Sequence, residues 1–160
     1  MQREALVTLK AHIQKHVSLL RQAMDEIDAA MLHDIPLLGK SYRAAVLIAG
    51  LLESYYTCVE TILVRISQFF ENNLLPEKWH QDLLDRMTLD IPPLRPRILS
   101  GDVYRDLLEL MRFRHFKRYY FGTAYDWDRL DDLLKRVRRM HPNLLIDFDR
   151  FLQFLDTMEL

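Results

Sequence analysis

The stretch RFRHFKRYY, residues 112–120, is the densest group of side chains in this sequence that could take part in chemistry. Four cations and one histidine stand among its aromatic residues: Arg112, Arg114, His115, Lys117 and Arg118. Arginine and lysine contact phosphate oxygens, and RNA bases stack on aromatic or guanidinium planes. The segment therefore predicts an RNA- or phosphate-binding site. The plainer interpretation is a helix whose aromatic residues face the core and whose cations face water.

Elsewhere the candidate motifs are weaker. Glu77 and His80 have the i, i+3 spacing with which di-iron bundles bind metal, but such sites need a second Glu-x-x-His, and the sequence has none. We therefore interpret them as a surface pair on a short helix. Cys58 is the single cysteine, which excludes an intramolecular disulfide and favours a packing role over a nucleophilic one. No glycine-rich phosphate loop, nucleophile elbow or HExxH motif occurs, so neither a metal nor a cofactor is expected.

Composition predicts one compact domain over residues 1–160. The chain is 49% hydrophobic and 28% charged, with only 4 Gly and 6 Pro. A charged N-terminal segment and the absence of a long uninterrupted apolar run predict a cytoplasmic protein without a membrane partner. The net charge is −1, yet residues 95–139 carry twelve Lys and Arg against seven Asp and Glu. The cationic segment therefore lies in a locally basic region.

Apolar periodicity predicts the elements that must position this segment. Apolar residues recur every three or four positions, which is typical of amphipathic helices, and no segment reads as a strand. The segment DIPPLRPRILSGD, with three prolines, predicts an extended surface connection. We expect an all-α, up-and-down bundle of about six helices built on two long antiparallel ones. The expected helices cover residues 6–31, which a Pro36–Gly39 breaker ends; about 41–73; a shorter one from Pro76; one from Ser100 or Asp102 to Gly122; 126–141; and a last one from Pro142 to Met158.

From about Ser41 to its end the chain resembles the HepT-like branch of the HEPN superfamily. The resemblance rests on ESYYTCVETILVRISQFFENNL, on WHQDLLDRMTLDIPPLRPRILSGDVYRDLLELMRFRHF, and on DWDRLDDLLKRV followed by LIDFDRFLQFL. It implies an all-helical homodimer that acts as a metal-independent endoribonuclease. It also implies a toxin–antitoxin pair in which the partner is a minimal nucleotidyltransferase.

The motif implied by the resemblance reads Arg, four residues, His, one residue, Tyr. Here the arginine falls on Arg114, the histidine position on Tyr119 and the tyrosine position on Phe121. In the implied reaction a base deprotonates the RNA 2′-hydroxyl, while arginine neutralises charge that develops on the phosphate. A tyrosine with a pKa of about 10 is a poor base at neutral pH. The implied partner places AMP on the motif tyrosine, which leaves nearby hydroxyls as candidates for nucleotidylation: Tyr119, Tyr120 and Tyr125.

Three hypotheses follow for function. The first is a HepT-like protein that keeps its fold, its dimer and its nucleotidyltransferase partner but has weakened or lost catalysis at Arg114 and Tyr119. The second is an active ribonuclease in which His115 is the acid/base, with transfer RNA as a candidate substrate. In this hypothesis the phosphate is held by Arg112, Arg114 and Arg118. The third is a non-catalytic dimer module that binds RNA or protein. In each RNA-binding case the expected phosphate contacts are Arg112, Lys117 and Arg118.

Overall fold

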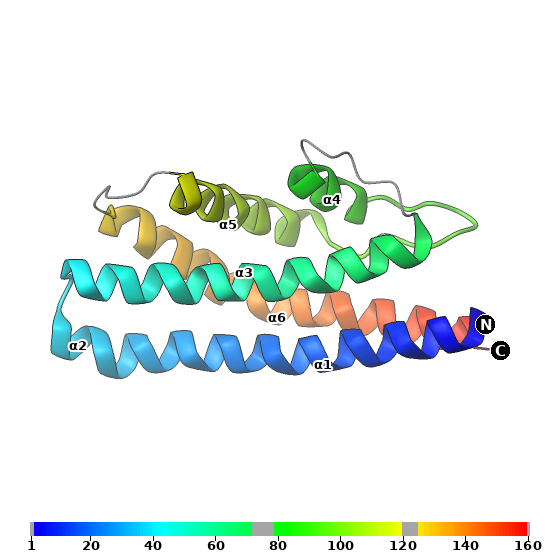
Figure 1. Cartoon of the computed structure of the whole chain (residues 1–160), viewed down its shortest axis with the longest axis horizontal. Coiled ribbons are helices and arrows are strands. Elements are labelled where there is room, and N and C mark those ends of the chain that lie inside the picture. The colour runs from blue at the N-terminus through cyan, green and yellow to red at the C-terminus, as the bar shows by residue number, and fades with distance from the viewer. Residues whose placement is uncertain (1, 72–78, 120–124, 160) are drawn as a thin grey trace.

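The computed structural model describes residues 2–71, 79–119 and 125–159, and for residues 117–119 it describes the backbone alone. These residues form helices, apart from connections that include one antiparallel bridge between Ile91 and Arg95. The chain runs up and down: α1 and α3 are antiparallel, α5 runs against α3, and α6 returns so that both termini lie at one end (Figure 1). The predicted all-α bundle on two long antiparallel helices is confirmed.

The first helical arm is longer than predicted. Helix α1, Gln2–Ala29, continues through a π-helical turn, Ala30–Asp34, into the single turn α2, Ile35–Leu38. Of the predicted Pro36–Gly39 breaker, Pro36 does not interrupt the helix, because it lies in the first turn of α2, where proline is tolerated. Gly39 does end it: the chain reverses there, with a φ of 65° that glycine readily adopts. Ser41 then caps α3 by accepting a hydrogen bond from the Ala44 N–H at 3.1 Å.

Helix α3, Tyr42–Phe70, is the central element and packs against α1, α5 and α6. By length and composition alone it could cross a membrane, but half of its most apolar window is buried within the bundle. That is the behaviour of a core helix. Its buried face carries bulky residues that include Tyr55, Tyr56 and Ile62, each at most 1% exposed. The buried residues of α3 include one charged residue, Glu60.

The connection between α4, Trp79–Met87, and α5, Gly101–Tyr119, is partly inside the protein rather than on its surface as predicted. Ile98 and Leu99 are fully buried, and Arg95 is 2% exposed. The Arg95 guanidinium bonds the Glu71 carboxylate and, among the described residues, donates to three backbone carbonyls of this region, at 2.9–3.0 Å. A connection without helical hydrogen bonds can be buried because this guanidinium satisfies its carbonyl groups.

Helix α6, Trp127–Met158, replaces the two helices predicted to divide at Pro142. Proline inside a helix costs about 3 kcal/mol. Each large apolar side chain that α6 buries beyond Pro142 contributes about 1.5–3 kcal/mol, and several are buried there: Leu144, Phe148, Phe151 and Leu155. Continuing as one helix keeps them all on the core face, so packing outweighs the proline penalty. The predicted boundaries at Pro76 and Gly122 lie outside the described residues.

Candidate functional site

The guanidinium of Arg114 lies inside the bundle, between α5 and α3. Its Nη2 atom is 2.9 Å from both carboxylate oxygens of Glu60, and Nη1 donates to the Thr57 hydroxyl at 3.3 Å. The guanidinium carbon stands 4.7 Å from the centre of the Tyr56 ring. Arg114 is 4% exposed and Glu60 7% exposed. The three α3 residues fall within about one helical turn, so a single face of α3 surrounds the guanidinium.

His80, in the first turn of α4, completes this cluster. Its Nδ1 atom is 2.8 Å from the Oε2 atom of Glu60 and 3.0 Å from the Nη2 atom of Arg114, and its ring stacks on Trp79 at 3.7 Å between centres. A guanidinium only donates hydrogen bonds and a carboxylate only accepts them. Nδ1 therefore serves one neighbour in each tautomer. With the proton on Nδ1, the bond goes to Glu60, and Nε2 is left as a basic nitrogen.

Arg114, Glu60, His80 and Thr57 together form what we call the Arg114 cluster. A carboxylate that orients an imidazole is an arrangement suited to moving a proton, and a guanidinium is suited to stabilising an oxyanion. Among the three ionisable members, only the imidazole is appreciably accessible, since the His80 side chain is 33% exposed against 5% for Arg114 and 9% for Glu60. The charge of Arg114 is moreover balanced by Glu60. Burial raises the pKa of Tyr56 above its ordinary range, so its hydroxyl stays protonated beside the cluster.

The other predicted site residues lie apart from this cluster or outside the described part of the chain. Arg112 is on the exposed side of α5 and donates to Glu109 at 2.8 Å. His115 is exposed, about 100° around the helix from the buried Arg114. Tyr125 packs against Phe113, with ring centres 6.2 Å apart. The structure does not describe the side chains of four predicted residues: Lys117, Arg118, Tyr119 and Tyr120. The same holds for Phe121 at the motif tyrosine position.

The sequence predicts only Arg114 of this cluster and misses Glu60, His80 and Thr57. The Glu-x-x-His spacing predicts a surface pair of His80 with Glu77, which lies outside the described residues, whereas the structure pairs His80 with Glu60, 20 positions earlier in the chain. The signal for Glu60 was present, because it is a charged residue on an otherwise apolar helix face. Such a residue needs a buried partner of opposite charge. Its identity as Arg114, 54 positions away, could not be read from helical periodicity.

The chain also contains a second Arg-x4-His spacing, Arg136 to His141, which does not make a joint site. Arg136 bonds Asp106 and Asp132, while Nδ1 of His141 is 2.9 Å from the hydroxyl of Tyr55. Cys58 is half-buried, its thiol lies 3.3 Å from a backbone carbonyl, and burial raises its pKa to about 11. A thiol with that pKa is a poor nucleophile at neutral pH. The described residues contain no group of three His, Cys, Asp or Glu side chains suited to a metal ion.

The fold and the site together define a class of protein: an antiparallel helical bundle with a polar cluster centred on an arginine of α5. A family model described as HepT-like protein matches residues 47–155, well over half of the chain. The chain therefore belongs to the HepT-like branch of the HEPN superfamily, as its sequence predicted. The match contains α4, α5 and most of α3 and α6, and with them the whole Arg114 cluster. No match was found among curated proteins or among solved structures.

Proposed function

We propose that this chain is the HepT-like component of a HEPN/nucleotidyltransferase toxin–antitoxin pair, and that its ancestral ribonuclease activity is weakened or lost. Family membership supports the general assignment. The observation that supports weakened catalysis is the state of Arg114, whose guanidinium is bound by the Glu60 carboxylate with 5% of its side chain exposed. An arginine held in this way is not presented to a phosphate group.

The energetic argument concerns the buried ion pair. Separating the members of such a pair leaves an uncompensated charge, at a cost of about 3–5 kcal/mol. A phosphate that drew Arg114 away from Glu60 would have to overcome that cost, which corresponds to a factor of roughly 10² to 10³ or more in rate. The replacement of the motif histidine by Tyr119 acts in the same direction, because a phenol with a pKa of about 10 is a poor general base at neutral pH.

The expected partners follow from this assignment. The protein forms a homodimer in the cytoplasm, pairs with a nucleotidyltransferase antitoxin, and retains RNA, with transfer RNA as the first candidate, as a ligand. Candidate hydroxyls for nucleotidylation remain Tyr119, Tyr120 and Tyr125. Copurification of the two proteins from a strain that expresses both tests the pairing. Mass spectrometry of the copurified chain would then locate an added AMP.

Cleavage of a bulk transfer-RNA pool in chelator-containing buffer tests the catalytic part of the proposal. We expect little cutting by the unmodified protein and no further loss in Arg114→Ala. The double substitution Tyr119→His with Phe121→Tyr should raise cutting, because it restores the implied base and hydroxyl. Strong cutting by the unmodified protein that disappears in Arg114→Ala would contradict weakened catalysis.

A second candidate function is residual ribonuclease activity with His80 as the acid/base. It is favoured by the 2.8 Å contact between His80 and Glu60, which can orient the imidazole beside Arg114. The sequence alone suggests His115 for this role. The two histidines provide matched variants: His80→Ala should abolish any weak cutting, whereas His115→Ala should leave it unchanged. The reverse result would restore the original hypothesis.

A further inference from the structure

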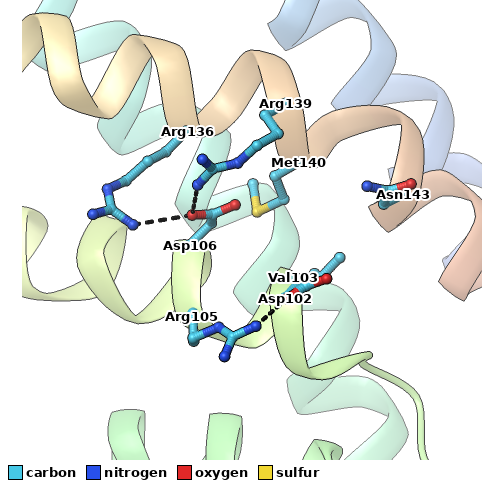
Figure 2. A pocket seen from close by; sticks show the side chains of 8 residues that line it. All are labelled: Asp102, Val103, Arg105, Asp106, Arg136, Arg139, Met140 and Asn143. Atoms are coloured by element: carbon cyan, nitrogen blue, oxygen red, sulfur yellow. Dashed lines mark hydrogen bonds and ion pairs between the residues drawn. The ribbon is translucent and has the colours of Figure 1, made fainter.

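A second polar centre lies on the outside of the bundle, in a cleft between the start of α5 and the middle of α6 (Figure 2). We call it the α5–α6 cleft. It has a volume of about 380 Å³. From Asp106 to Arg114 is eight residues along α5, or about 12 Å at the usual helical rise, so the cleft is separate from the Arg114 cluster. Its polar lining consists of Asp102, Arg105, Asp106, Arg136, Arg139 and Asn143.

Asp106 organises the two arginines of α6. It is 3% exposed, and its Oδ1 atom accepts from Nη2 of Arg139 at 2.7 Å and from Nη1 of Arg136 at 3.1 Å. Figure 2 shows both guanidinium groups converging on this one oxygen. One carboxylate thus holds two guanidinium groups on the same wall of the cleft. Because these side chains are already ordered, they lose less conformational entropy when a ligand binds. Arg136 is held further by Asp132, at 2.8 Å from its Nε atom.

The remaining hydrogen-bonding capacity belongs mainly to Arg105 and Arg139. Their side chains are 70% and 67% exposed. Among the described residues, Arg105 bonds only Asp102 and Arg139 only Asp106. A guanidinium carries five N–H donors, so each retains donors that point to solvent. The lining holds three guanidinium groups against two carboxylates, both already engaged in ion pairs, and it therefore favours an anion.

We propose that the α5–α6 cleft binds phosphate, with Arg105 and Arg139 as the contacting residues and Asp106 as the residue that positions Arg139. Guanidinium groups match phosphate geometry through paired N–H donors. The lining contains no aromatic side chain on which a base could stack. Recognition is consequently of the phosphate and independent of base identity, which favours the RNA backbone over a free nucleotide as the source. The proposal does not depend on whether the Arg114 cluster cleaves RNA.

Binding of a fluorescent single-stranded oligouridylate, followed by anisotropy at several KCl concentrations, tests this site. The test variant is Arg105→Gln with Arg139→Gln, which leaves Arg136 on Asp106. The matched control is Arg21→Gln with Arg138→Gln, which removes the same charge from exposed positions on α1 and α6; Arg138 pairs with Asp28 of α1 and is not part of the lining. Thermal unfolding followed by circular dichroism verifies that both variants are folded.

We expect the cleft variant to bind at least about tenfold more weakly at low salt, the effect of losing a charge-assisted hydrogen bond. The slope of log K against log [KCl] should become less steep by about 1.4. Each phosphate contact with a single strand contributes about 0.7 to this slope, and the variant removes two contacts. The control should keep the slope of the unmodified protein. Equal losses in the two variants, or no binding by the unmodified protein, would overturn the proposal.

Competition distinguishes the two sources of phosphate. AMP is added to the oligouridylate complex at constant ionic strength, and the measurement is repeated with the cleft variant. Displacement by AMP that disappears in this variant would mean that the cleft takes free phosphate groups as well. Displacement only by unlabelled oligonucleotide would identify the RNA backbone as the ligand. If the variants changed dimer formation while RNA affinity stayed constant, the cleft would be a protein interface and the phosphate proposal would be wrong.

Discussion

Glu60→Gln should destabilise this protein strongly, although it changes a single charge and preserves side-chain shape. Glu60 supplies both carboxylate oxygens to Nη2 of Arg114, and each residue is less than 10% exposed. Removing one member of a buried ion pair costs about 3–5 kcal/mol, because the remaining charge has no counter-ion and little water. The new amide oxygen can still accept one hydrogen bond from Arg114. The expected loss is therefore at the lower end, about 3 kcal/mol.

Arg114→Met gives the complementary measurement. It leaves the Glu60 carboxylate with one remaining polar partner, the Nδ1 atom of His80 at 2.8 Å, so we expect a smaller loss of about 2 kcal/mol. The double variant removes both charges and leaves neither uncompensated. Its loss should be smaller than the sum of the single losses by about 2 kcal/mol, which is the coupling that a double-mutant cycle measures.

Urea unfolding at neutral pH is the assay. A domain of this size has a stability of about 5–15 kcal/mol, so a loss of about 3 kcal/mol leaves it folded. With an m-value of about 2 kcal/mol/M, the midpoint should fall by about 1.5 M. Asp28→Asn is the control, because its partner Arg138 is 56% exposed and such surface pairs contribute under about 1 kcal/mol. Should Glu60→Gln and Arg114→Met both behave like this control, the guanidinium would be free to contact phosphate, and our reason for weakened catalysis would fail.

Two further predictions concern groups whose pKa values the fold shifts. Burial, followed by the nearby charge of Arg21, lowers the pKa of His141 below its ordinary 6.5. The unfolded chain then binds more protons just below that value, so stability should decline as pH falls from about 7.5 to about 5.5. His141→Asn should decline less in urea titrations over that range, and an equal decline would refute the assignment. Burial raises the pKa of Cys58 from 9.0 to about 11, so a thiol-reactive dye at neutral pH should label it about a hundredfold more slowly than it labels the urea-unfolded chain. Equal labelling rates before and after unfolding would contradict this.

Most of the fold could be predicted from local patterns in the sequence. The spacing of Leu6, Leu9 and Ile13, for example, is that of an amphipathic helix, and all three are buried in α1. Such periodicity can be interpreted without knowing which helices pack against it, because it shows which side of a helix must be buried away from water. The predictions that failed were those at Pro36 and Pro142 and the surface path predicted for residues 90–102, where a local rule about proline was applied without the packing around it. The family was recognisable from the same sequence.

The sequence by itself determined an all-helical HepT-like chain with an arginine, Arg114, at the expected motif position and a tyrosine, Tyr119, at the motif histidine position. Only the tertiary structure decided what that arginine does. Glu60, His80 and Arg114 lie on three different helices, and they meet because burying the apolar faces of α3, α4 and α5 brings their polar exceptions together. A buried charge selects its counter-ion by proximity in space, and distance along the chain does not enter that selection.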